Sequence, residues 1–351
     1  MAQDQDIICE IRGAAGVVIL NRPKALNALS LGMVRELARA LDAWENDPQV
    51  TRVVVISTSE KAFSAGGDIR WLHDCGKAGR QDEMLAFWGE EYILNHRIKT
   101  YPKPYVALID GIVMGGGVGI SLHGSHRIAG DRYLFAMPEV GIGFFPDVGA
   151  TYALPRLPGA FGNFLALTGE RIGAADALSV GLATHSVASD RMAELADALT
   201  SRAALDDILA GFTIARPPGP LQAQAATIAD AFAAASPLEV VARLKALATG
   251  GSAFAGKLAQ TIAAKSPTSV AIAYEQMRRG KDLDFAEAMR TEFRIVSRIA
   301  HGHDFYEGVR AVVIDKDQAP HWRPDTLEAV EPAAIAAYFA PLGAAELKLE
   351  V

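Results

Sequence analysis

The chain has 351 residues, of which 50% are hydrophobic and 21% are charged, and its formal net charge at pH 7 is −7. This composition is ordinary for a soluble globular protein, and an acidic chain without a block of basic residues is a poor candidate for binding nucleic acid. Two cysteines, Cys9 and Cys75, are too few for a disulfide framework or a cysteine-rich zinc site.

The N-terminal residues, MAQDQD, are polar and acidic, a pattern typical neither of a secretory signal nor of an arginine-rich transit peptide. No run approaches the roughly 20 apolar residues that span a bilayer. We therefore expect a cytoplasmic protein without a membrane partner, with its two thiols unpaired. The eight histidines show no paired-ligand spacing, so no metal site is expected.

Strands, glycine-rich loops and helices alternate in the predicted first half of the chain. Strands are predicted over residues 7–12, 16–20 and 53–56, and the last of these is a continuous apolar run, typical of a strand buried on both faces. Helices are expected from the N-cap residue Ser30 to about Trp44, and over residues 80–99.

A further strand, residues 106–109, leads into the glycine cluster 115–119 and a helix-like stretch, and short strands are predicted near 127–129 and 133–135. The order strand, glycine-rich loop, helix therefore occurs twice, at 53–69 and at 106–124. This weak repetition indicates an α/β fold built as a spiral of stacked ββα units.

Strand signals nearly vanish in the last third of the chain. The stretch ARPPGP at 215–220 predicts a linker or a tight corner. We place a boundary between residues 205 and 220, which gives a core of residues 1–210 and a helical C-terminal region of residues 211–351. Helices are predicted over residues 221–235, 237–248, 252–264, 268–279 and 284–300.

Two glycine loops are candidate donors of backbone hydrogen bonds. Gly66 and Gly67 follow a buried strand, and the N–H of Gly67 can point at a carbonyl oxygen; the alternative is a plain turn capped by Asp68. The cluster Gly115–Gly119 exposes N–H groups at the start of a helix, where the partial positive charge suits an oxyanion. A dinucleotide-binding loop and a close helix–strand crossing are the alternatives, although GGGVG is not the G-x-G-x-x-G pattern.

Two carboxylates follow the glycine cluster. Glu139 lies in the apolar stretch FAMPEV, where a raised pKa would suit a base or a nucleophile, and Asp147 follows Phe-Phe-Pro. The alternatives are a buried, ion-paired glutamate for Glu139 and a helix N-cap for Asp147. From its own surroundings Glu91 is expected to be solvated or salt-bridged on its helix. A G-x-S-x-G motif is absent from the sequence, which argues against an α/β-hydrolase.

Seven segments, taken together and in order, resemble the crotonase (enoyl-CoA hydratase/isomerase) superfamily, and within it the 3-hydroxyisobutyryl-CoA hydrolase subgroup. The resemblance runs over nearly the whole chain and implies a crotonase-like spiral core followed by helices. The segments are NRPKALNAL (21–29), AFSAGGDIR (62–70), EEYILN (90–95), KPYVALIDGIVMGGGVGIS (103–121), FAMPEVGIGFFPDVGATYALPRL (135–157), FLALTGERI (164–172) and GHDFYEGVRAVVIDKD (302–317).

The resemblance implies an acyl-CoA thioester substrate, no separate cofactor and no metal. It implies a catalytic set in which the N–H groups of Gly67 and Gly116 form an oxyanion hole and Glu139 and Asp147 are the catalytic carboxylates. The oligomeric state stays open between a homo-oligomer built through the C-terminal helices and an appendage that covers that surface instead. The implied substrate-binding residues are Lys24, Ala25, Leu26, Ala65, Asp68, Ile69, Glu91, Gly115 and Lys316.

One departure from the family pattern bears on the reaction. Hydratases of this family carry a glutamate shortly after the glycine triplet, and this chain has Gly119 there. Together with this departure, the resemblance to the hydrolase subgroup implies hydrolysis of a short β-hydroxyacyl-CoA, most of all 3-hydroxyisobutyryl-CoA, as in valine breakdown. Glu139 would attack the thioester or activate a water. The alternatives are an enoyl-CoA hydratase or isomerase on the same fold and a non-catalytic acyl-CoA-binding protein.

Overall fold

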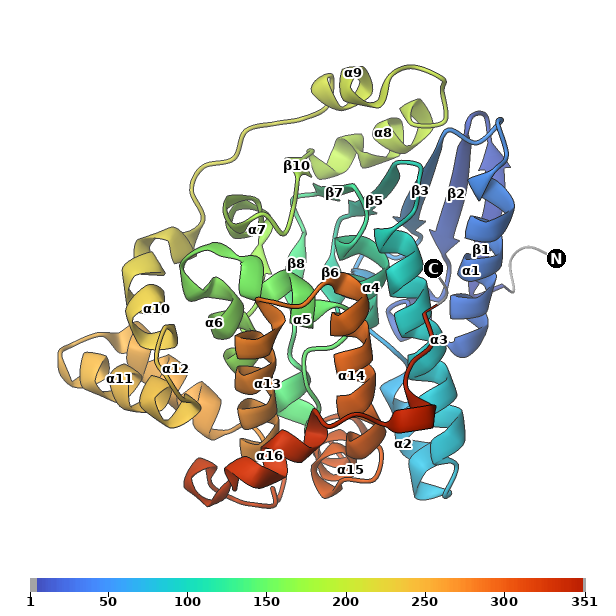
Figure 1. The fold of residues 1–351 in the computed structure, drawn as a ribbon. Coiled ribbons are helices and arrows are strands. Elements are labelled where there is room, and N and C mark those ends of the chain that lie inside the picture. The colour runs from blue at the N-terminus through green and yellow to red at the C-terminus, as the bar shows by residue number, and fades with distance from the viewer. Residues whose placement is uncertain (1–4, 350–351) are drawn as a thin grey trace. The chain divides into compact units, whose positions relative to one another are not determined.

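Apolar runs of the first half of the chain form two β-sheets in the computed structural model, which describes residues 5–349 (Figure 1). The larger sheet has the strand order β1-β2-β3-β5-β7-β10. β1 and β2 form an antiparallel hairpin, and the other neighbours in this sheet are parallel. The strands are β1 (Ile7–Arg12), β2 (Ala15–Leu20), β3 (Arg52–Ser57), β5 (Tyr105–Ile109), β7 (His126–Ala129) and β10 (His185–Ser186).

The two faces of this sheet are covered, which confirms the predicted double burial of β3, where Val53, Val54 and Val55 are at most 1% exposed. On one face Val17, Val54 and Val106 pack into a core with residues around α8 (Met192–Ala198) and α9 (Leu205–Ala210). α1 (Leu31–Glu45) packs against β2. The ring of Trp44 can lie directly over Gly16, because glycine has no side chain to occupy that space. Ser30 caps α1 as predicted, accepting a hydrogen bond from the Met33 N–H.

The smaller sheet has the order β4-β6-β8-β9, with β4 and β6 parallel and β8 and β9 antiparallel. β4, β6 and β9 were not predicted, because strands of two or three residues are too short to show a periodic pattern. β6 leads into α4 (Gly116–Leu122). The strands are β4 (Ala62–Ser64), β6 (Ile112–Met114), β8 (Leu134–Ala136) and β9 (Ile172–Gly173).

Contacts divide the chain into two units, each built from three separate segments. Unit 1 comprises the residues up to Asp68, Ile93–Phe135 and Ile172–Gly219. Unit 2 comprises Ile69–Tyr92, Ala136–Arg171 and the residues from Pro220 onward. The predicted division into residues 1–210 and 211–351 stays a prediction.

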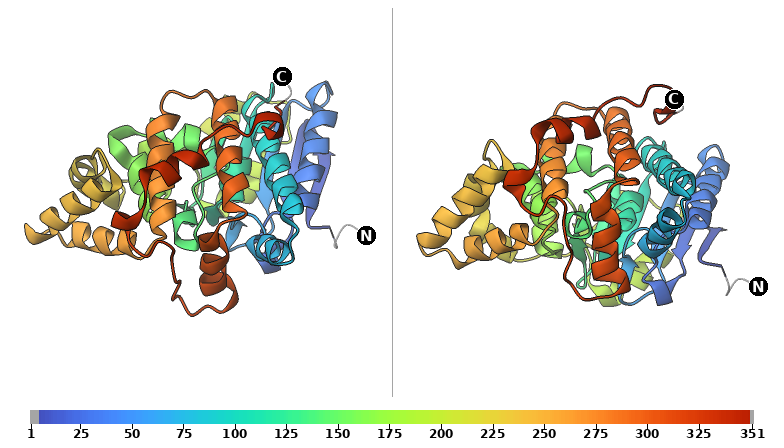
Figure 2. Two further views of the ribbon diagram at one scale, coloured as in Figure 1. Left: turned by 60° about the horizontal axis from the view of Figure 1, so that its bottom comes forward. Right: turned by 90° about the horizontal axis from the view of Figure 1, so that it is seen from below.

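Unit 2 is helical, and the five helices predicted after residue 220 are confirmed as α10 to α14. α11 packs on α10 and α12, while α16 contacts both α13 and α14 (Figure 2). α2, α15 and α16 were not predicted. No helix within residues 5–349 has the length and apolar character needed to cross a membrane. The helices are α2 (Ile69–Lys77), α3 (Gln81–Lys99, shared with unit 1), α5 (Ala150–Ala153), α6 (Phe161–Thr168), α10 (Ala225–Phe232), α11 (Pro237–Thr249), α12 (Ala253–Ala263), α13 (Pro267–Gly280), α14 (Phe285–Ile299), α15 (His303–Val309) and α16 (Pro332–Tyr338).

Candidate active site

The two glycine loops of unit 1 begin at the same end of the smaller sheet. β4 and β6 are parallel, so their carboxyl ends lead side by side into the loops 65–68 and 115–116. A Cβ on Gly66 would lie 3.7 Å from the Gly116 nitrogen, and one on Gly117 would lie 2.5 Å from the Ser64 carbonyl oxygen. The close helix–strand crossing is therefore real, and it brings the two predicted donor loops into contact.

Each loop leaves a backbone N–H available. Leu29 pairs with the first loop through its N–H to the Gly66 oxygen at 2.8 Å and through its oxygen to the Asp68 N–H at 2.9 Å. This pairing turns the Gly67 N–H away from Leu29, and no described residue accepts from it. Gly116 is the first residue of α4, so its N–H lies outside the helical hydrogen-bond ladder. The turn between β6 and α4 needs the φ of +45° at Gly115.

The predicted CoA-contacting loop lies beside the first glycine loop. Residues Pro23–Ala25 form a 3-10 turn, and the carbonyl of Leu26 accepts from the Ala65 N–H at 3.0 Å. The Asp68 carboxylate binds the Arg22 guanidinium at 2.9 Å, so it ties the two loops together. Unit 1 therefore brings Lys24, Ala25, Leu26, Ala65, Asp68 and Gly115 to the region of Gly67 and Gly116.

Unit 2 holds the predicted carboxylates, and Glu139 is the most isolated of them. It begins the 3-10 turn Glu139–Ile142, is 6% exposed, and has no hydrogen-bond partner for Oε2 within the described residues. No ion pair with a described residue involves it, so the ion-paired alternative is wrong. Burial, assisted by the charge of Asp147, holds the pKa of Glu139 well above its usual range, against a hydrogen bond from its own backbone.

Asp147 is buried as well, and its Oδ2 accepts a hydrogen bond from the Tyr92 hydroxyl at 2.8 Å. The alternative of a helix N-cap is wrong, because Gly149 occupies the N-cap position of α5. Burial raises the pKa of Asp147 to about 7, although the Tyr92 hydroxyl and a backbone N–H favour its ionised form.

Glu91 precedes Tyr92 on α3 and is 2% exposed, with Oε1 unpartnered by any described residue. The expectation that it is solvated or salt-bridged is therefore wrong. Burial, and then the charges of Asp147 and Glu292, hold its pKa well above the usual range. A buried carboxyl group with a free oxygen can accept or donate a hydrogen bond. The substrate-binding role that the resemblance implies for Glu91 stays a prediction.

Two residues of this cluster were missed by the sequence analysis: Tyr92 and Glu292. Glu292 lies on α14, is fully buried, and accepts from the Gly149 N–H at 2.8 Å and the Thr151 N–H at 2.9 Å. Burial and the charge of Asp147 raise its pKa to about 8. A signal was present in the sequence, since a charged residue sits in the apolar stripe of the predicted helix 284–300.

Two predicted substrate-binding residues remain less defined. Ile69 is the first residue of α2. Lys316 is exposed and adopts a φ of +59° in the turn after the π-helical segment Arg310–Ile314. Both belong to unit 2, and their roles stay predictions.

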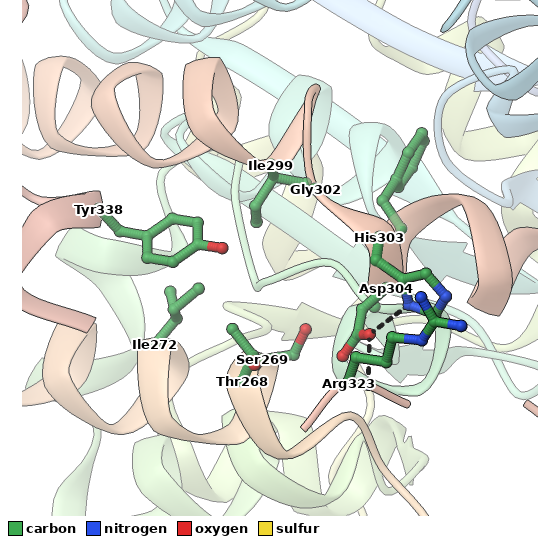
Figure 3. A pocket seen from close by; sticks show the side chains of 11 residues that line it. Thr268, Ser269, Ile272, Ile299, Gly302, His303, Asp304, Arg323 and Tyr338 are labelled. Carbon is green, nitrogen blue, oxygen red and sulfur yellow. Dashed lines mark hydrogen bonds and ion pairs between the residues drawn. The ribbon is translucent and has the colours of Figure 1, made fainter. Parts of the chain in front are cut away.

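Three cavities within the two units lie away from these predicted residues. Cavities of about 310 Å³ in unit 1 and about 280 Å³ in unit 2 include none of them. A third, of about 50 Å³ in unit 2, lies around Asp304 and Arg323 (Figure 3). The Asp304 carboxylate accepts from the Ser266 hydroxyl and from the Arg323 N–H. Such a volume accommodates a water or two rather than a CoA thioester.

Comparison with known proteins gives a consistent family. The model of the enoyl-CoA hydratase/isomerase family matches residues 15–339. A Danio rerio protein named 3-hydroxyisobutyryl-CoA hydrolase, mitochondrial, is 46% identical over 362 residues, which cover 98% of this chain and 92% of that protein. The Homo sapiens protein of the same name is 41% identical over 354 residues, covering 98% and 91%. Those names place the relatives in mitochondria, so the cytoplasmic location expected here stays a prediction.

Solved structures agree on the fold. A carnitinyl-CoA dehydratase from Mycobacterium thermoresistibile superposes with a TM-score of 0.94 at 40% identity over 99% of both chains. An enoyl-CoA hydratase from Rhodobacter sphaeroides 2.4.1 gives 0.92 at 39% identity over 98% of this chain and 100% of the other. The predicted crotonase-like α/β fold with a helical C-terminal region is thereby confirmed.

Proposed function

Because the chain belongs to the enoyl-CoA hydratase/isomerase family, we propose that it hydrolyses a short β-hydroxyacyl-CoA thioester, 3-hydroxyisobutyryl-CoA above all, to the free acid and CoA. The observation that carries the proposal is the buried Glu139 carboxyl group, which among the described residues has no cationic partner and one oxygen without a hydrogen bond. The near full-length similarity to proteins named 3-hydroxyisobutyryl-CoA hydrolase supports the choice of substrate.

In the proposed reaction the thioester carbonyl oxygen accepts hydrogen bonds from the Gly67 and Gly116 N–H groups. This oxygen gains negative charge when the carbonyl carbon is attacked, and a fixed donor aimed at it lowers the barrier by roughly 3–4 kcal/mol. Both donors are backbone groups held by paired strands and a helix start, so they need little reorganisation during the reaction.

Glu139 acts in its ionised form by one of two routes. In the first, its oxygen bonds to the carbonyl carbon and the C–S bond breaks; a water that gives its proton to the ionised Asp147 then cleaves the anhydride and frees the Glu139 carboxylate. In the second, Glu139 takes a proton from a water whose oxygen attacks the same carbon. In both routes Asp147 donates the proton that the leaving CoA thiolate takes up. A pKa of about 7 suits this exchange near neutral pH.

Hydration of an enoyl-CoA is the second candidate function, because the two superposed structures are those of a carnitinyl-CoA dehydratase and an enoyl-CoA hydratase. Against it, Gly119 stands where hydratases carry a glutamate, so only one of their two acid/base groups is present. Turnover of crotonyl-CoA at a rate comparable to thioester hydrolysis would favour this second function.

The deciding experiment measures free-thiol release from a panel of hydroxyacyl-CoA thioesters. Wild-type protein should release thiol fastest with 3-hydroxyisobutyryl-CoA. Glu139→Gln, which keeps the shape but cannot attack or take a proton, should lower kcat by at least about 10³-fold with little change in KM. Unchanged thiol release by Glu139→Gln would instead indicate the third reading, a non-catalytic acyl-CoA-binding protein.

A further inference from the structure

The loop that carries Asp147 adopts a conformation that its own sequence disfavours. Val148, a β-branched residue, has a φ of +50°, and Gly149 follows with a φ of +89°. A left-handed backbone at a β-branched residue is rare, and it persists only where the surroundings impose it. The neighbouring helices must therefore hold this loop in place.

Two helices supply the restraint. On α14, the fully buried Glu292 accepts from the N–H groups of Gly149 and Thr151, the second and fourth residues after Asp147. On α13, the Gln276 amide donates to the Pro146 carbonyl, on the other side of Asp147, and to the Thr151 hydroxyl. Asp147 is thus fastened on both sides, with its carboxyl group on the Tyr92 hydroxyl at 2.8 Å.

Burying a glutamate only to accept backbone hydrogen bonds is energetically unfavourable. Asn or Gln could accept a backbone hydrogen bond without a buried acid, and no described lysine, arginine or histidine pairs with Glu292. The titratable groups around it are all acids: Asp147, Glu91, Glu139 and Tyr92. Only a carboxyl group provides two acceptors for two N–H groups and a site that can share protons with Asp147.

We propose that Glu292 is a positioning residue of this enzyme: its carboxyl group holds the turn after Asp147 through two backbone N–H groups and couples the protonation of Asp147 to its own. The inference rests on the proposed function for its effect on kcat, but not for its effect on the titration of Asp147. Glu292 is not assigned a contact with substrate.

The first test is a ¹³C NMR titration of the carboxyl carbons, with the Asp147 signal assigned by its absence from Asp147→Asn. In the wild type this signal should change near pH 7 and again near pH 8, as Asp147 and then Glu292 ionise. In Glu292→Gln the second change should disappear. Two unchanged inflections in that variant would overturn the proposal, whether or not the protein hydrolyses thioesters.

The second test is the pH profile of kcat with 3-hydroxyisobutyryl-CoA. Glu292→Gln keeps one acceptor, so it should retain kcat within about tenfold of wild type and lose the dependence near pH 8. Glu292→Ala leaves two buried N–H groups unpaired and should lose a further tenfold or more in kcat with KM within about threefold. Glu287→Gln, an ion-paired glutamate near the start of α14, is the matched control and should behave as wild type.

Wild-type kcat and an unchanged pH profile in Glu292→Ala would refute the positioning role. If Glu292→Ala does not fold, the profile of Glu292→Gln decides instead. Absence of hydrolysis by the wild type on every thioester tested would remove the proposed function, and the NMR titration would then decide the inference alone.

Discussion

At the scale of single residues, the unsatisfied oxygens of Glu91 and Glu139 are the clearest functional signal in the described chain. A buried polar atom without a hydrogen bond costs about 1–3 kcal/mol of stability. Unit 2 carries this cost at two carboxyl groups that lack a counter-cation among the described residues. Such an arrangement is understandable if the free oxygens bind a substrate or take part in its reaction.

A substitution at Gly117 tests whether the position of the Gly116 N–H matters, because it leaves both backbone donors in the chain. In Gly117→Ala the new Cβ would lie 2.5 Å from the Ser64 carbonyl oxygen, so the start of α4 must move away from β4 and take the Gly116 N–H with it. We expect kcat to fall about 10- to 100-fold, less than the effect of deleting a donor outright. Steady-state thiol release measures the effect.

Gly32→Ala is the control for this substitution. It also adds a methyl group to a glycine inside a helix, but its nearest neighbour would be at an ordinary 3.7 Å, so kcat should be unchanged. Wild-type kcat in Gly117→Ala would mean that the position of the Gly116 N–H does not matter for the reaction.

At the scale of elements, local signals determine how much was predictable. Four successive helices, α11 to α14, each begin with a side chain that accepts from the N–H three residues later, and all four were predicted from the sequence. β4 and β6 were not predicted, because a strand of three residues that pairs with segments distant in the sequence carries no local pattern. The glycines made both loops candidate donors with alternatives left open, and the family resemblance implied their role in an oxyanion hole. The capping residues are Ser236, Ser252, Ser266 and Asp284.

The capping residues Ser252 and Ser266 differ in the number of hydrogen bonds that their hydroxyl groups make. Ser252 accepts only from the Ala255 N–H, so Ser252→Ala should cost about 1 kcal/mol of the free energy of unfolding. Ser266 accepts from the Ser269 N–H and also donates to the buried Asp304 carboxylate at 2.6 Å. Ser266→Ala should therefore cost about 2–3 kcal/mol, since a charged acceptor loses its partner. Urea denaturation compares the two variants, and equal costs would show that the bond to Asp304 adds nothing.

At the scale of the whole molecule, the carboxylate cluster was the least predictable feature. Glu139 and Asp147 were found because each lies in a distinctive loop, and Glu91 through a family resemblance. Glu292 is remote in sequence, on a helix whose other features are ordinary, and only the packing of α14 beside the Asp147 loop explains it. A charged residue in the apolar stripe of α14 marks this position as unusual, but the sequence does not show which loop it contacts.

The cluster also gives the protein a specific dependence of stability on pH. Asp147 and Glu292 have folded-state pKa values of about 7 and about 8, above the values near 4 expected in the unfolded chain. Between these limits the folded state binds more protons than the unfolded state, so the free energy of unfolding falls as the pH rises. Each pKa unit corresponds to about 1.4 kcal/mol, so the two groups together contribute a change on the order of several kcal/mol between pH 4 and pH 8.

Urea denaturation at pH 5.5, 7 and 8.5 would measure this dependence. The wild type should lose stability steadily over the range, and Glu292→Gln should lose less of it, because one of the proton-binding groups is gone. Glu287→Gln changes an ion-paired glutamate of the same helix and should retain the wild-type slope. If Glu292→Gln has the same slope as the wild type, then Glu292 does not bind an extra proton in the folded state, and the linked titration of Asp147 and Glu292 would have to be abandoned.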